Sequence, residues 1–134
     1  ALEDYFKNDS YGGQTPQETY TLYLEALKRG DLDTASLYFF WERQVGQKKK
    51  LEDLKAKGEL EKYIADLPKW EELKEEEYVN KNGKRYILIG YNNESHKVKA
   101  PDGSEFISPP GEYIKFSIVF QLNKAANIWK IYSL

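Results

Sequence analysis

Apolar positions in the first half of the chain recur with the spacing of an α-helix. The first stripe stands at i, i+3, i+4 and i+7: Tyr20, Tyr23, Leu24 and Leu27. Thr15-Pro16 before it is typical of a helix start, and Glu18 puts negative charge near the positive end of the helix dipole. Gly30 is typical of a helix end, and Asp31 can cap a following helix directly. The pattern predicts two helices joined by a very short link.

The second helix is expected to be apolar on two sides. Its two rows are Leu32, Ala35 and Phe39, and Leu37, Phe40 and Trp41. Such a wide apolar arc predicts burial against two neighbours. Further helix is predicted from Gln44 to Leu67, with a break at Gly58 and an end at Pro68, because proline removes a helical hydrogen bond.

After Trp70 the pattern changes from helical to alternating. Strands are predicted at 72–80 and 84–91, joined by Lys81-Asn82-Gly83, because Asn-Gly is a strong hairpin signal. The stretch 92–111 is rich in turn residues and is expected to carry one short strand. Two long strands are predicted at 111–123 and 127–134, and the first of them alternates apolar residues on one face.

Helices followed by strands indicate an α+β fold, in which a helical hairpin and a further helix pack on a curved antiparallel sheet. Residues 1–14 are polar and contain Gly12-Gly13, so they are predicted to be a lead-in segment or linker, with 15–134 a single domain. Tyr5, Phe6 and Tyr11 are the residues that can anchor this segment to the body or to a neighbouring chain.

Charge and composition restrict the classes of partner and site that the chain can have. The chain has 134 residues, 20 basic against 22 acidic, and a formal charge of -2, which disfavours nucleic acid as a partner. No apolar run approaches the roughly 20 residues of a membrane span. Without cysteine there is no thiolate metal site or cysteine nucleophile. The chain has no methionine and begins at Ala1, so we expect a processed export signal or a trimmed boundary upstream.

Candidate chemistry is sparse. His96 is the one histidine, and its polar surroundings predict an exposed loop. Glu18, Asp31 and Asp33 are explained by helix capping, and no acid spacing matches a calcium loop. We therefore predict no catalytic residue, no metal and no cofactor.

Two stretches resemble a known family. TPQETYTLYLEALKRGDLDTASLYF at 15–39, and Ile128-Trp129-Lys130-Ile131-Tyr132 near the end, resemble the opening hairpin and last strand of the nuclear transport factor two-like superfamily, also called SnoaL-like or cystatin-like α+β cones. The resemblance is strongest to small bacterial envelope proteins and lipoproteins of unassigned function. It implies a strongly bent sheet around a long helix, a cone whose mouth holds a small apolar ligand, and a homodimer through the sheet face.

Aromatic residues mark the candidate pocket. The chain has eleven tyrosines, six phenylalanines and three tryptophans. One interpretation is core packing with hydroxyls at the rim, and the other is a ligand pocket lined by aromatic rings. Arg43 follows the aromatic run and either turns to solvent, pairs with a glutamate, or clamps a carboxylate or phosphate. The candidate pocket lining is Tyr20, Tyr23, Phe40, Trp41, Arg43, Tyr63, Tyr86 and Phe116.

The predicted function is a non-catalytic domain outside the bacterial cytoplasm that binds a small apolar ligand or another protein chain. The alternatives are a small isomerase, dehydratase or cyclase that uses the cone, and a structural dimerisation module.

Overall fold

The structure, a computed structural model, describes residues 2–77 and 80–134. Its helices are α1 (Leu2–Asn8), α2 (Pro16–Lys28), α3 (Leu32–Leu37), α4 (Gln44–Ala56) and α5 (Leu60–Asp66), with 3-10 turns η1 (Trp41–Arg43) and η2 (Trp70–Glu72). Its strands are β1 (Lys74–Glu76), β2 (Gly83–Asn92), β3 (His96–Lys99), β4 (Glu105–Ser108), β5 (Gly111–Asn123) and β6 (Ile128–Ser133). The architecture is α+β, as the sequence predicts.

The caps of the helical hairpin are confirmed. The Thr15 hydroxyl accepts a hydrogen bond from the Glu18 backbone N–H at 3.1 Å, and Pro16 is the first residue of α2. Gly30 has a φ of 76°, a left-handed conformation that suits glycine at a helix end. The Asp31 carboxylate then accepts from the Thr34 N–H at 3.1 Å. These local bonds fix the short link between α2 and α3.

The second helix is shorter than predicted. It ends at Leu37, and Phe39 forms an isolated parallel bridge with Ile131 of β6. The Phe40 N–H donates to the Ile131 carbonyl at 2.7 Å, and the Ile131 N–H donates to the Tyr38 carbonyl at 2.9 Å. Extended backbone paired with the sheet therefore replaces the predicted last helical turn, and the expectation of one continuous helix through Trp41 is wrong.

The later elements agree with the alternating pattern in part. α4 and α5 separate at Gly58, whose φ is 72°, as predicted. The predicted strand at 72–80 is limited to β1 over its described part, and residues 78 and 79 lie outside the described residues. The stretch 92–111 holds two short strands, β3 and β4, rather than one.

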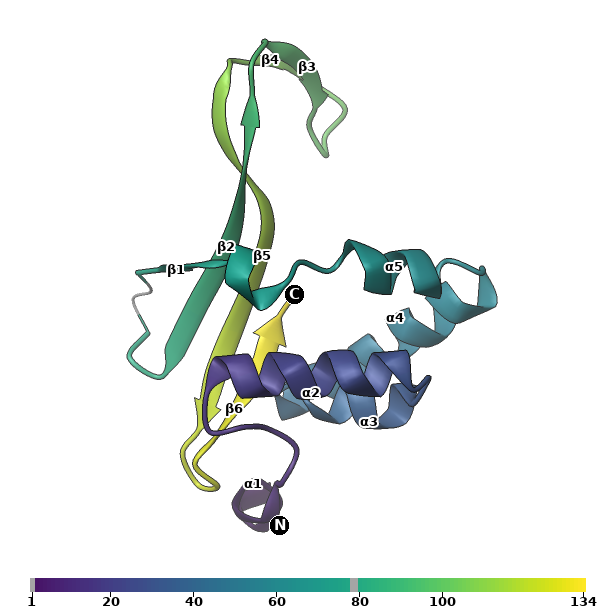
Figure 1. Cartoon of the computed structure of the whole chain (residues 1–134), viewed down its shortest axis with the longest axis vertical. Coiled ribbons are helices and arrows are strands. Elements are labelled where there is room, and N and C mark those ends of the chain that lie inside the picture. The colour runs from purple at the N-terminus through teal and green to yellow at the C-terminus, as the bar shows by residue number, and fades with distance from the viewer. Residues whose placement is uncertain (1, 78–79) are drawn as a thin grey trace.

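The main sheet is antiparallel, in the order β1-β2-β5-β6, and β3-β4 forms a separate two-stranded sheet. Figure 1 shows the helices gathered beside the lower part of the main sheet, with α2 crossing near β6. The core between them includes Tyr20 and Tyr23 of α2, and Ile118, Phe120 and Ile131 of the sheet. Each of the last three is fully buried.

The upper halves of β2 and β5 leave this core. They form a two-stranded ribbon that projects well beyond the helices and carries β3-β4 at its end (Figure 1). β1 pairs with β2 only at Arg85–Ile87, and β6 pairs with β5 only at Val119–Asn123. We call residues 89–92 and 111–115, with β3 and β4, the arm.

Candidate functional site

The predicted pocket residues fall into two groups. Tyr20, Tyr23, Tyr63, Tyr86 and Phe116 surround the core between the helices and the sheet. Phe40, Trp41 and Arg43 lie on another side, around η1. Trp41 is 46% exposed, which corrects the expectation that it is buried on the wide apolar arc of the second helix. The early end of α3 is the reason, because residues 38–40 are no longer helical.

The interior tyrosine hydroxyls bind protein atoms. The Tyr20 hydroxyl donates to the Pro68 carbonyl at 2.5 Å. The Tyr23 and Tyr63 hydroxyls are 3.1 Å apart, and the Gln47 Nε2 donates to the Tyr23 oxygen at 3.0 Å. Burial is the main cause that raises the pKa of Tyr20, Tyr23 and Tyr63, so all three are neutral phenols at neutral pH.

Aromatic rings fill the space beside these tyrosines. The Trp70 ring centroid lies 4.5 Å from that of Tyr86 and 6.0 Å from that of Phe120. Tyr20 approaches Trp70 from α2 with a centroid distance of 5.7 Å. Phe116 is partly buried and packs against this cluster. The arrangement is that of a packed core with satisfied hydroxyl groups.

Gln47 is a site residue that the sequence interpretation missed. Its side chain is nearly buried, and it connects α4 to the tyrosine pair of α2 and α5. A signal for it exists, because Gln47 stands four residues before Leu51 and seven before Leu54, on the apolar stripe of the same helix. The three lysines that follow it in sequence, Lys48 to Lys50, conceal that position.

In the second group, Arg43 lines a surface cleft of about 310 Å³ between η1, the start of α4 and the end of β6. Its lining is Phe39, Glu42, Arg43, Gly46, Gln47, Tyr132, Ser133 and Leu134. The Arg43 guanidinium carbon lies 4.6 Å above the centre of the Tyr132 ring. Phe40 packs against Tyr132 and Phe6 instead and does not line the cleft.

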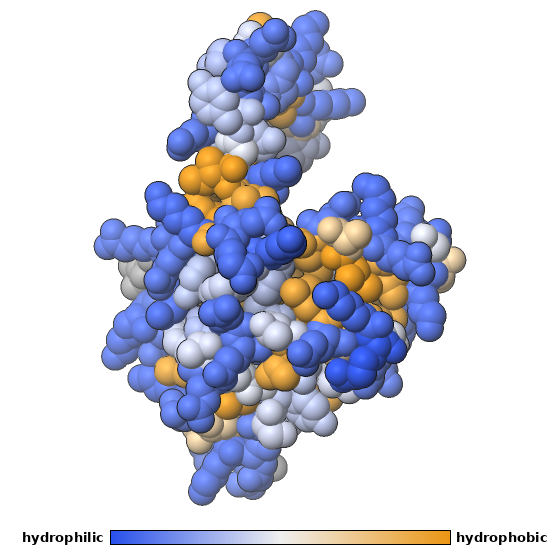
Figure 2. All heavy atoms as spheres, viewed as in Figure 1, coloured by the Kyte–Doolittle hydropathy of each residue, from blue (hydrophilic) through white to orange (hydrophobic). Residues whose placement is uncertain are grey.

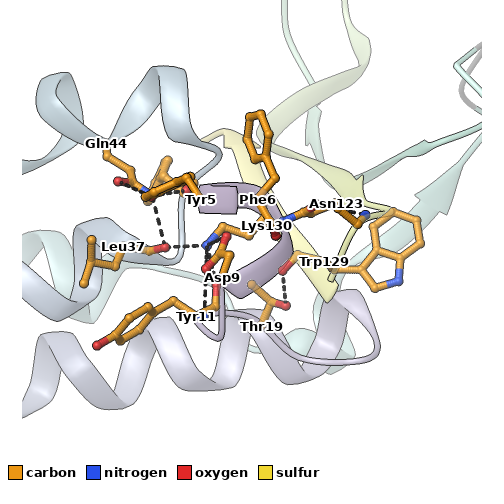
Figure 3. Close-up of polar contacts among 12 residues, drawn as sticks. Tyr5, Phe6, Asp9, Tyr11, Thr19, Leu37, Gln44, Asn123, Trp129 and Lys130 are labelled. Carbon is orange, nitrogen blue, oxygen red and sulfur yellow. Dashed lines mark hydrogen bonds and ion pairs between the residues drawn. The ribbon is translucent and has the colours of Figure 1, made fainter. Parts of the chain in front are cut away.

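A buried lysine holds the N-terminal segment against the body (Figure 3). The side chains of Lys130 on β6 and Asp9 are 1% and 5% exposed, and Lys130 Nζ lies 2.9 Å from Asp9 Oδ2. Lys130 also donates to the carbonyls of Tyr11 at 2.5 Å and Leu37 at 2.6 Å. Burial lowers the pKa of Lys130, and Asp9 opposes this shift.

Backbone contacts continue this attachment. The Trp129 N–H donates to the Gly13 carbonyl at 2.8 Å, and Thr19 Oγ1 donates to the Trp129 carbonyl at 2.8 Å. A Cβ at Gly12 would overlap the Trp129 carbonyl oxygen, so glycine permits the close approach. The Asn123 side chain donates to the Phe6 carbonyl at 2.9 Å (Figure 3). Residues 6–13 are thus hydrogen-bonded to the sheet.

The arm displays apolar side chains to solvent. The exposed ones are Ile89, Tyr91, Phe106, Ile107, Tyr113 and Ile114, at 39% to 67% exposure. Figure 2 shows hydrophobic surface at the base of the arm, between the body and its mostly polar end. The Tyr113 ring covers Gly90 on the neighbouring strand, where a Cβ would overlap it.

Reactive groups are few in the described ranges. His96 is exposed, as predicted, but it lies in β3 opposite Ser108 rather than in a loop. Residues 2–77 and 80–134 contain no cluster of three or more histidine, aspartate or glutamate side chains arranged to hold a metal ion. No helix in the same ranges is long and apolar enough to cross a membrane.

No family model, curated protein or solved structure matches this chain. Membership of the nuclear transport factor two-like superfamily therefore stays a prediction from the residues at 15–39 and 128–132.

Proposed function

We propose that the protein is a non-catalytic interaction domain whose arm binds another protein chain. The observation that carries this proposal is the exposed apolar surface on a two-stranded ribbon that extends away from the core. A two-stranded ribbon is only marginally stable by itself in water, and large exposed apolar patches mark interaction sites. A partner that covers the arm would both stabilise it and remove this surface from water.

Both faces of the arm take part in the proposed contact. Ile89 and Tyr91 alternate with Gly90 on β2, and Ile89 pairs directly with Ile114, so these three apolar side chains share one face. Tyr113 pairs with Gly90 and lies on the opposite face. A partner that reaches both faces must have a groove or must wrap around the ribbon.

The exposed area supports the same geometry. At roughly 100 Å² each, less than the 150–250 Å² that a whole aromatic side chain buries, the six exposed side chains offer about 600 Å². A specific complex buries about 800 Å² on each partner. The arm therefore supplies most of one side of an interface only when both of its faces and its end are covered.

The edge of β5 is poorly suited to adding a strand. Leu88 pairs with Phe116 and Ile89 with Ile114, so Lys115 is an extra residue that forms a bulge. A bulge, a charged lysine and the nearby Pro110 are features that protect sheet edges from pairing with other chains. We infer that the partner binds side chains on the faces of the arm rather than its backbone.

The remaining expectations stay predictions of the family resemblance: the cone shape, the small apolar ligand, the sheet-face homodimer and a location outside the bacterial cytoplasm. The enzyme alternative has less support, because the interior hydroxyl groups are hydrogen-bonded to protein atoms and His96 lies far from them in sequence and is exposed. Packed rings between the helices and the sheet likewise favour an interaction surface over an interior ligand.

Site-specific photo-crosslinking tests the proposal. A photoreactive phenylalanine analogue replaces Tyr91 on the arm, or Lys49 on the exposed side of α4 as a control, and each protein is irradiated in an extract of its source organism. We expect a discrete crosslinked product from position 91 that disappears in the Ile89→Ser/Ile114→Ser variant. Circular dichroism of that variant establishes that the fold is retained.

The same products at both positions, or a product that persists in the double serine variant, would contradict the proposal. Native mass spectrometry of the purified protein identifies the case in which the partner is a second copy, because a dimer held by the arm is lost in the same variant.

A further inference from the structure

We propose that the cleft between η1, α4 and the end of β6 binds a carboxylate with a neighbouring N–H donor, the chemistry shared by the C-terminus of a peptide and a free amino acid. This site is separate from the arm and does not depend on the function proposed for it. Its two recognition groups are Arg43 and Gln47, which lie on opposite sides of Gly46 in sequence and both line the cleft.

Arg43 supplies the group for the carboxylate. Its guanidinium stacks on the Tyr132 ring at 4.6 Å and forms no ion pair with a carboxylate in the described part of the chain. Stacking uses the face of the guanidinium and leaves its N–H edge available. That edge matches a carboxylate with two parallel hydrogen bonds, which a lysine cannot reproduce.

Gln47 supplies an acceptor for the N–H group. Its Nε2 is committed to the Tyr23 hydroxyl, which fixes the amide orientation. Its Oε1 receives no hydrogen bond from the described residues, even though Gln47 is only 9% exposed and therefore largely shielded from water. Arg43 immediately precedes α4 and stands four residues before Gln47, a spacing that places side chains next to each other along a helix. Between them Gly46 has no side chain, and an added Cβ would meet open space.

The size and charge of the cleft restrict the ligand. Its volume of about 310 Å³ is at the lower end of ligand pockets, enough for one residue rather than a long chain. Phe39 and Tyr132 give it apolar walls. Arg43 is the one cation among its lining residues and Glu42 is an anion beside it, so a singly charged carboxylate fits better than a phosphate dianion.

Titration of the ¹⁵N-labelled protein with small probes tests this site. N-acetyl-L-alanine represents a peptide C-terminus, and L-alanine represents a free amino acid. We expect one of the two to shift the backbone signals of Gly46 and Ser133 in a saturable manner, and the stronger one identifies the natural source. N-acetyl-L-alanine amide lacks the carboxylate, and its affinity should be at least about tenfold weaker. N-acetyl-N-methyl-L-alanine lacks the N–H, and a loss of roughly three- to tenfold is expected.

Variants at exposed positions complete the test without disturbing the core. Arg43→Gln and Arg43→Lys should both weaken binding, the first by at least about tenfold, whereas Lys49→Gln on the exposed side of α4 should leave it unchanged. Full affinity of Arg43→Lys would overturn the inference that Arg43 binds the carboxylate through two parallel hydrogen bonds. Equal shifts from the acid and the amide probes, or no saturable shift from either natural-type probe, would overturn the carboxylate site.

Discussion

Replacement of Lys130 by methionine is predicted to be among the most destabilising single changes in this chain. Methionine retains most of the volume of the lysine stem but removes the ammonium group. Asp9, with a side chain 5% exposed, would then keep one hydrogen bond, from the Tyr11 backbone N–H at 3.0 Å. The Tyr11 carbonyl would lose its donor, and the Leu37 carbonyl would keep only the Gln44 side-chain amide, at 3.5 Å.

The magnitude follows from these losses. Breaking a buried ion pair from one side costs about 3–5 kcal/mol, because the other charge remains buried and unpaired. A chain of this length has a free energy of unfolding of about 7–20 kcal/mol. We therefore expect Lys130→Met to remain folded but to melt roughly 10–20 °C lower.

Thermal and urea denaturation followed by circular dichroism measures this loss. Lys62→Met is the matched control, because Lys62 pairs with Asp66 at 3.2 Å while both side chains are largely exposed. The control should cost less than about 1 kcal/mol. Adding Asp9→Asn to Lys130→Met should recover about 1–3 kcal/mol, since no unpaired carboxylate then remains buried. A cost for Lys130→Met no larger than that of the control would refute the reasoning.

Two further predictions concern the interior tyrosines. Tyr23→Phe leaves the Gln47 amide without its acceptor and should lower the free energy of unfolding by about 1–3 kcal/mol in urea denaturation. Tyr91→Phe on the exposed arm is the control and should change that free energy by less than about 0.5 kcal/mol. Equal effects of the two variants would contradict the hydrogen-bond assignment. Burial raises the pKa of Tyr20 and Tyr23, so the unfolded chain releases these protons near pH 10 while the folded chain retains them. Their contribution to stability is therefore complete below about pH 10 and is lost as the pH rises further. Urea denaturation measures this loss, and a midpoint unchanged between about pH 9 and pH 11 would disprove it.

Local signals in the sequence were sufficient for the helix starts, the α4–α5 break and β5. Thr15 and Asp31 cap helices through hydrogen bonds to residues three positions away, and such short-range contacts leave a clear pattern. The end of α3 was not predictable in the same way, because the competing hydrogen bonds of residues 38–40 come from Ile131. Long-range pairing overrides helix propensity there.

The site residues divide in the same way, between those with a local sequence signal and those placed by distant contacts. Aromatic residues at helical spacing predicted the core tyrosines, yet nothing local separates the buried Lys130 from an exposed lysine on an alternating strand. Nor does the continuous apolar alternation of β5 indicate the bulge at Lys115. The pattern predicts Ile114 and Ile118 on one face of the strand, but the bulge turns Ile114 to the opposite face, where it pairs with Ile89 and is 49% exposed, whereas Ile118 is fully buried.

The attachment of the N-terminal segment by Lys130 has a consequence for protein synthesis. Asp9 and Lys130 are 121 positions apart, so Asp9 leaves the ribosome well before its partner is made. At about 5–20 residues per second, this interval is roughly 6 to 24 seconds. The α2–α3 hairpin can form during that time from its own caps, whereas Phe6 of α1 remains without the Asn123 side chain that anchors its carbonyl to the sheet. Closure of the N-terminal segment is therefore a late event of folding, and the aromatic residues of α1 are the part of the nascent chain that chaperones can reach longest.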